Sequence, residues 1–303
     1  MEASTETRNA HAHAPGWAAW SLLTLGVIAA SVSAILIRYA SDADALAISF
    51  WRCAAGAVAL APFARFGAAA RWHVRTSLLA GAFLALHFAA WITSVEMTTV
   101  AESVLLVSTT PVFAALAARC LFAERLAIIG WVGIALAIGG AAVVGLGGGT
   151  EGQSSLLGNI LALVGGVAAA GYLMAGGVSR RGLGIIEYGV IAYAASAFLL
   201  LIASAAGGAE LWGYGATTWW AIVGIIVGPQ LLGHTVINLV LKDIDATTVS
   251  VAIMAEPIIA SALALVLFDE VPSLLAVPGG AAILAGIYLV SSLRRAPPAV
   301  IVE

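Results

Sequence analysis

The chain has 303 residues, of which 62% are hydrophobic and 10% are charged, and its formal net charge is −3. An ordinary soluble domain carries about 25% charged residues, so this composition excludes that class and indicates an integral membrane protein. The two cysteines lie in apolar stretches and give no disulfide framework.

The first 16 residues are polar, and we expect them to form a tail ahead of the first membrane helix. Residues 17–34, which end in SVSA, have some features of a cleaved signal peptide. The apolar stretch continues through Ile37, so we interpret it as a membrane helix. Segments long enough to cross a bilayer recur along the chain and predict ten spans. They are 17–38, 44–64, 74–95, 99–122, 126–147, 155–178, 185–206, 217–241, 245–268 and 273–293.

The distribution of basic residues predicts the orientation of these spans. If the N-terminus is cytoplasmic, 11 of the 13 Lys and Arg residues fall on the inner side. The outer loops then hold only Arg38 and several acids, and Arg52 lies within a span. This asymmetry follows the positive-inside rule. We therefore expect an all-α, multi-pass protein of the cell inner (plasma) membrane, with both termini cytoplasmic.

Two proline-containing stretches reveal an internal repeat. When Pro111 is aligned with Pro257, the LF-x-E pattern that ends each span also matches, at an offset of 146 residues. His87 and His234 match at an offset of 147. An odd number of spans in each half would invert the second half, an arrangement known from secondary transporters. We predict two five-helix repeats, 17–149 and 155–294, followed by a C-terminal tail, 295–303.

FWRCAAGAV in the second span and the P-x(9)-L-F-x-E pattern closing the fourth and ninth spans resemble the EamA-type drug/metabolite transporter superfamily. The stretch ALHFAAWITSVEMTTVAESVLLVSTTPVF is similar to the YddG-type exporters of aromatic and other neutral amino acids. The resemblance implies a secondary transporter that needs no cofactor. It also implies that the glycine-rich fifth and tenth spans are peripheral, and their small residues predict close packing.

Polar side chains within spans should face the protein interior, because exposing them to lipid is costly. On the third span, helical spacing places four residues on one face: Leu84, His87, Trp91 and Ser94. On the eighth span, a similar face holds Gln230, His234 and Asn238. We interpret both faces as parts of a central cavity that holds an amino acid, with Trp91 stacking on its side chain. The alternative is that these groups form interhelical hydrogen bonds that only fix the packing.

Glu256 lies in mid-span beside Pro257, where it could meet a substrate ammonium group or carry a coupling proton. A protonated acid bonded to a backbone carbonyl is the alternative. Tyr172 could line the cavity or face lipid. Arg52 is assigned a structural role, by snorkelling or by tethering two helices. Pro111 frees a backbone carbonyl that nearby hydroxyls could satisfy.

Ser108 and Thr110, next to Pro111, are further candidates for substrate contact, and both prolines are candidate gating positions. Thr99 and Glu102 form a capping-box pattern at the start of the fourth span.

Other classes of function have weaker support. No metalloprotease, paired-acid or nucleotide-binding motif indicates an enzyme, a metal site or an ATP-driven pump. A channel usually needs rings of repeated groups, and only the histidines repeat. A phosphate-bearing substrate would need more basic residues in the spans, whereas a cationic drug would suit Glu256 and Trp91. We expect an amino-acid substrate and the bilayer as partners, no nucleic acid, and a functional monomer. Proton coupling stays open.

Overall fold

The structure is a computed structural model that describes residues 17–67, 71–122, 127–146, 155–240, 249 and 252–292. Within these ranges the chain forms helices and turns, with no strand. The polar tails predicted at 1–16 and 295–303 lie outside them, as does the connection between the predicted halves.

The described residues of the first half form seven α-helices and one short 3-10 turn. They are α1 (Trp17–Ser31), α2 (Ser33–Tyr39), α3 (Ala45–Leu60), η1 (Ala61–Phe63), α4 (Arg71–Met97), α5 (Val100–Val107), α6 (Thr110–Phe122) and α7 (Ile128–Leu146). The first and fourth predicted spans are each broken into two helices, at Val32 and at Ser108–Thr109.

The described part of the second half begins with the helix at Leu156. Its elements are α8 (Leu156–Ser179), α9 (Ile185–Gly207), α10 (Ala216–Ile225), the π-helix η2 (Ile226–Thr235), α11 (Val236–Val240), α13 (Ala255–Phe268) and α14 (Ala276–Ser292). Eight helical segments of the described chain are long and apolar enough to cross a membrane, and two shorter apolar helices cover Ala255–Phe268 and Ala276–Ser291.

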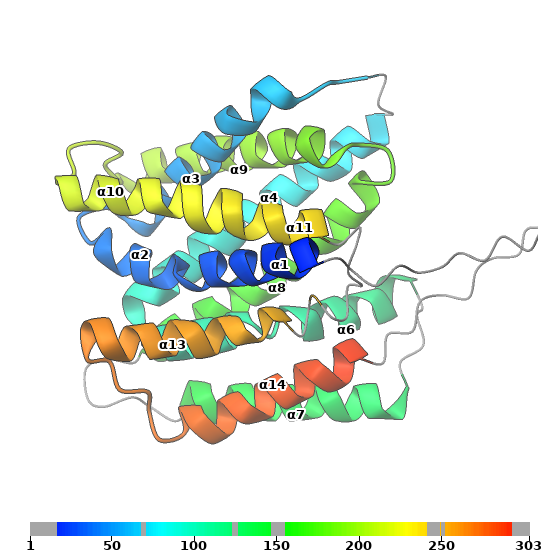
Figure 1. Cartoon of the computed structure of the whole chain (residues 1–303), viewed down its shortest axis with the longest axis vertical. Coiled ribbons are helices and arrows are strands. Elements are labelled where there is room, and N and C mark those ends of the chain that lie inside the picture. The colour runs from blue at the N-terminus through cyan, green and yellow to red at the C-terminus, as the bar shows by residue number, and fades with distance from the viewer. Residues whose placement is uncertain are drawn as a thin grey trace, which may run out of the picture.

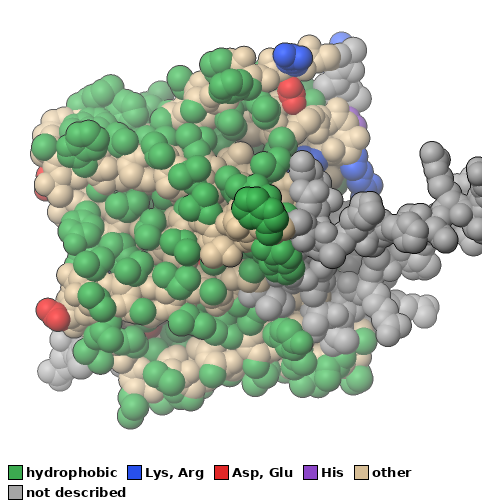
Figure 2. Space-filling model, viewed as in Figure 1, with side chains coloured by type: hydrophobic (Ala, Val, Ile, Leu, Met, Phe, Trp, Pro, Cys, Tyr) green, Lys and Arg blue, Asp and Glu red, His purple; other side chains and the backbone are tan. Residues whose placement is uncertain are grey.

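The helices lie roughly side by side, and turns gather at both ends of the bundle (Figure 1). Hydrophobic side chains cover much of the visible face (Figure 2). Many of the large ones are exposed, Val266 by 76% and Val277 by 68%, which suits contact with lipid rather than water. The Lys and Arg side chains visible in this view lie toward the right, and acidic ones lie at the left edge and near the top.

The main helix contacts join the two halves: α4 packs along α8, α3 along α9, and α7 along α14. The α7–α14 contact is close because glycines face each other. A Cβ atom at Gly140 would lie 2.6 Å from the backbone oxygen of Gly279, and one at Gly286 would lie 2.5 Å from that of Gly133. The close packing predicted for these spans is confirmed, and it forms one side of the bundle in Figure 1.

Candidate functional site

Arg52 lies at the centre of a polar cluster between the two halves. It extends from α3 and is 1% exposed. Its Nε donates a 2.6 Å hydrogen bond to Oε1 of Gln230 on η2, and Nη1 donates a 3.2 Å bond to Ser33 Oγ. The guanidinium carbon lies 4.1 Å from the ring centroid of Phe88 on α4. Arg52 therefore does not snorkel: it tethers three segments, and its Nη2 atom has no hydrogen-bond partner.

The Arg52–Gln230 pair depends on a feature of the eighth span that the sequence analysis missed. Pro229 lies inside η2, a ten-residue π-helix. Proline lacks an N–H group and so interrupts α-helical bonding, and π-helical turns often mark functional sites. Gln230 directly follows Pro229 and is 1% exposed. The triplet GPQ, which places a proline within an apolar span, is the sequence feature that indicates this irregular segment.

His87 and Trp91 form an aromatic pair on α4. Their rings are stacked, with centroids 5.8 Å apart and planes inclined by 7°. His87 Nδ1 lies 2.9 Å from the carbonyl oxygen of Gly165 on α8. Trp91 is 4% exposed, and its indole N–H has no hydrogen-bond partner. The pair presents an aromatic surface and a free donor in the packed interior.

The other residues predicted on the face of α4 take part in packing. Leu84 is 3% exposed and belongs to the hydrophobic core. Ser94 is fully buried; its hydroxyl lies 2.7 Å from the carbonyl oxygen of Trp91 and 2.6 Å from Ser103 Oγ. Neither Leu84 nor Ser94 lines either of the two cavities described below.

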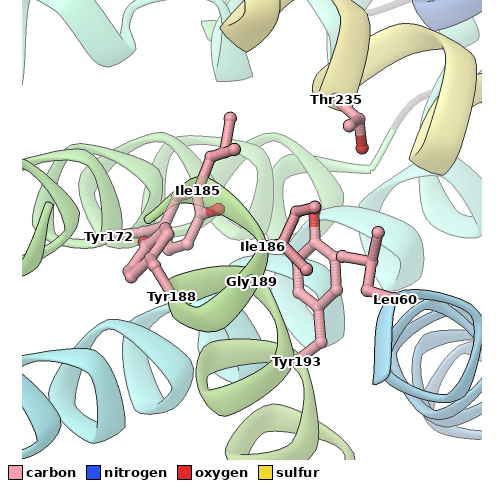
Figure 3. Close-up of a pocket in the computed structure, with 8 residues that line it drawn as sticks. All are labelled: Leu60, Tyr172, Ile185, Ile186, Tyr188, Gly189, Tyr193 and Thr235. Atoms are coloured by element: carbon pink, nitrogen blue, oxygen red, sulfur yellow. The ribbon is translucent and has the colours of Figure 1, made fainter. Parts of the chain in front are cut away.

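A small cavity of about 30 Å³ lies close to the cluster. Figure 3 shows its lining, with Tyr172 and Tyr188 on one side and Tyr193 beside Leu60 on the other. Tyr193 links the cavity to the cluster, because a Cβ atom at Gly56 would lie 3.2 Å from Tyr193 and 3.4 Å from Gln230. Such a volume holds only about one or two water molecules, so this cavity is too small for a larger ligand.

Glu256 and His234 lie at the edge of the same cluster. Glu256 is the second residue of α13 and is partly exposed. Its charge interacts with that of Arg52 without an ion pair, since the one ion pair found among the described residues joins Arg38 and Glu270. His234 is close enough to interact with both Arg52 and His87, yet it is more exposed than Gln230. The side chain of Asn238 lies outside the description.

The hydroxyl groups near Pro111 bond to the backbone. Thr110 Oγ1 donates to the carbonyl of Val107, the acceptor that Pro111 leaves free, at 2.8 Å, and lies 3.2 Å from that of Gly166. Ser108 Oγ donates to Val104 at 2.6 Å. The second proline has a similar setting. Pro257 lies in the first turn of α13, which begins at Ala255 after a turn at Met254, as Pro111 lies in the first turn of α6.

A larger cavity, of about 400 Å³, lies between α6, α7 and α8. Apolar side chains such as Val112, Phe113, Ile160 and Leu163 line it, and its lining contains no charged group. It offers nothing to hold a charged ligand. The polar cluster around Arg52 is therefore the better candidate site, despite the smaller cavity beside it.

A second polar cluster joins the halves near the end of α2. Arg38 Nη2 donates to the carbonyl of Thr98 at 2.7 Å and lies 3.5 Å from the carboxylate of Glu270. Glu270 also accepts a hydrogen bond from the backbone N–H of Val100, at the start of α5. Burial raises the pKa of the Glu270 carboxyl above its usual range, although Arg38 and the Val100 N–H act in the opposite direction.

Comparison with known protein families finds two matches along the chain. The profile of the EamA-like transporter family matches residues 17–146 and again residues 156–292. The chain belongs to the EamA-like transporter family. The two matches make this EamA-like protein a two-repeat membrane transporter of small metabolites, as its sequence motifs indicated.

Solved structures share the fold of this EamA-like transporter. Eighteen chains match, among them one described only as "Crystal structure of protein". It has a TM-score of 0.62 and 18% sequence identity, and the match covers 90% of this chain and 96% of that chain. At this identity the likeness concerns the fold alone. No curated protein matches the chain.

Proposed function

We propose that this transporter exports small metabolites, chiefly aromatic and other neutral amino acids, by alternating access around the Arg52 cluster. The observation that carries the proposal is the position of this cluster. It joins α3 of the first half to η2 of the second through a buried hydrogen bond. Ionisable groups are costly inside a membrane and usually mark a substrate or ion pathway. In transporters built from inverted repeats, that pathway lies between the repeats.

The chemistry of the cluster favours amino acids over the other substrates of this superfamily. The stacked rings of His87 and Trp91 offer a surface for an aromatic side chain. Among the described residues, Arg52 is the only Lys or Arg in the cluster, which disfavours phosphate-rich substrates. Glu256 and Trp91 would suit a cationic drug, the second candidate. The buried charge of Arg52 would repel such a cation, so we place the drug second.

We further propose ten transmembrane helices with both termini cytoplasmic, in the cell inner membrane. The distribution of charge supports this orientation, because exposed basic residues such as Arg71 and Arg75 at the start of α4, and Arg180 after α8, lie at ends predicted to face inward. The boundaries proposed for the two repeats are 17–149 and 155–294. We also propose that the protein works as a monomer and needs no bound cofactor.

The deciding experiment is counterflow in proteoliposomes with labelled neutral amino acids, with and without a pH gradient. We expect exchange of phenylalanine or tryptophan, and a response to the gradient would indicate proton coupling. His87→Ala and Glu256→Gln should reduce exchange, whereas Arg180→Gln, an exposed matched control, should not. If no neutral amino acid is exchanged, the proposed substrate is wrong. Normal exchange by both folded variants would remove their assignment to the site.

A further inference from the structure

Arg52 is a buried cation without a buried counterion in direct contact. Its three described neighbours, Gln230, Ser33 and the ring of Phe88, are all neutral. Burying a charge without a partner is costly, so such groups are normally paired with an opposite charge. A guanidinium group offers five N–H donors. Here Nε and Nη1 each make a hydrogen bond, and Nη2 makes none.

The arrangement of donors fits a carboxylate. Two neighbouring N–H groups of a guanidinium bind the two oxygens of a carboxylate in parallel, which is stronger and more directional than a neutral bond. Gln230 fixes the guanidinium through Nε and leaves Nη2 available. The guanidinium carbon lies over the ring of Phe88, which helps to hold the group in place. A carboxylate that reached Nη2 would meet a donor whose guanidinium group is already held by Gln230 and Ser33.

Glu256 is a candidate partner for the ammonium group of a zwitterion bound at Arg52. Glu256 interacts with Arg52 through its charge but forms no ion pair with it. An amino acid whose carboxylate bound the guanidinium would have Glu256 as a candidate partner for its ammonium group. The unpartnered N–H of Trp91 and its stacked ring lie in the same region of α4 as Phe88.

We propose that Arg52 binds the carboxylate of the transported substrate, so that the site selects amino acids over the corresponding amines. This inference rests on the proposed function and refines it. It replaces the purely structural role predicted for Arg52 from the sequence. Snorkelling would leave the guanidinium exposed, and the tether to Gln230 and Ser33 uses Nε and Nη1 but not Nη2.

The first test varies the substrate and leaves the protein unchanged. Counterflow by the full-length wild type is measured with phenylalanine, phenylalanine amide and phenethylamine, which differ at the carboxylate. Losing a hydrogen bond to a charged group should lower exchange of the amide and the amine by about 10- to 100-fold. Equal exchange of all three compounds overturns the role of Arg52 while leaving the proposed export of amino acids intact.

The second test varies Arg52. Arg52→Gln should remove the preference for phenylalanine over its amide, and Arg52→Lys should restore only part of it, because lysine lacks the planar fork. Arg180→Gln, at an exposed position, should behave as the wild type. Elution as a single species in gel filtration checks that each variant is folded. If Arg52→Gln is folded and keeps the preference, the inference is wrong.

A binding measurement separates this inference from the proposed function. If no amino acid is exchanged, thermal stabilisation of the protein in detergent is measured with phenylacetate and with 2-phenylethanol. Stabilisation by phenylacetate alone, lost in Arg52→Gln, supports a carboxylate site in a protein with another substrate. Equal effects of the two compounds, or no effect of either, overturn the site.

Discussion

The packing of α7 on α14 can be tested with two adjacent glycines. A Cβ atom at Gly140 would lie 2.6 Å from the Gly279 oxygen, 2.8 Å from the Ile283 nitrogen and 2.9 Å from the Ala282 Cβ. Two of these atoms are backbone, so the helices themselves must move apart. A Cβ atom at Gly139 would meet no atom within 4 Å, because that position faces outward.

We expect Gly140→Ala to lower the free energy of unfolding by about 1–3 kcal/mol, the usual range for overpacking. Gly139→Ala should leave it unchanged or raise it by up to about 1 kcal/mol, because alanine is the better helix former. The assay is unfolding of the purified protein in mixed micelles of dodecyl maltoside and SDS, followed by circular dichroism. Equal effects of the two substitutions would refute the argument, because they differ only in the helix face they occupy.

Three further predictions concern helix ends and the cluster around Glu270. Glu270→Ala should cost about 1–3 kcal/mol, because the buried N–H of Val100 loses its acceptor, whereas Glu270→Gln keeps an acceptor and should cost no more than about 1 kcal/mol for the lost pair with Arg38. If Glu270→Gln lost more stability than this, the ion pair with Arg38 would contribute more than the hydrogen bond from Val100. Burial raises the pKa of Glu270, so the folded state holds this proton more tightly than the unfolded chain. Its contribution to stability is largest below the ordinary pKa of about 4.3 and is lost as the pH rises through the raised value, so the melting temperature of Glu270→Gln should vary less with pH in this window. Thr99→Ala removes the hydroxyl that accepts from the Glu102 N–H at 3.2 Å and should cost about 1 kcal/mol in the same unfolding assay, with an unchanged stability showing that the cap is redundant.

Hydropathy and local motifs predicted the elements of this fold well. Apolar runs predicted the positions of the helical segments. A segment that crosses a bilayer must be long and apolar, and its backbone hydrogen bonds must be satisfied within the protein. The T-x-x-E pattern correctly predicted that Thr99 caps α5. The carboxylate of Glu102 accepts from Thr98 at 2.6 Å, a contact that the simple capping-box pattern does not predict.

The candidate site was less predictable, because its defining contact joins distant residues. Arg52 and Gln230 are 178 positions apart. Helical periodicity indicates which residues share a face, but it does not specify the partner across an interface. The prediction for the eighth span assumed α-helical spacing, whereas the segment that contains Pro229 forms a π-helix. Predicted neighbours therefore differ in exposure: Gln230 is buried and His234 is exposed.

Two irregular parts of the helices contact Arg52, whereas the close glycine contacts between α7 and α14 lie on another side of the bundle. Ser33, which bonds to Arg52, follows the break at Val32, and Gln230 is part of η2. Irregular turns have fewer α-helical bonds to lose and therefore bend at lower cost. The α7–α14 contact has no comparable freedom, because backbone atoms oppose each other there.

We therefore expect opening of the site to bend α1–α2 and α10–η2 while α7 and α14 move as one unit. In a variant with Cys53 and Cys120 replaced by serine, spin labels are placed in pairs at exposed positions, Ile128 with Val277 on α7 and α14, and Trp17 with Trp220 on α1 and α10. Once counterflow has established exchange of phenylalanine, saturation with phenylalanine should change the distance distribution of the second pair. The distributions are measured by double electron–electron resonance. The first pair should keep its distribution. A shift between Ile128 and Val277 would mean that the glycine contacts slide or separate, and that the motion is a rocking of whole halves.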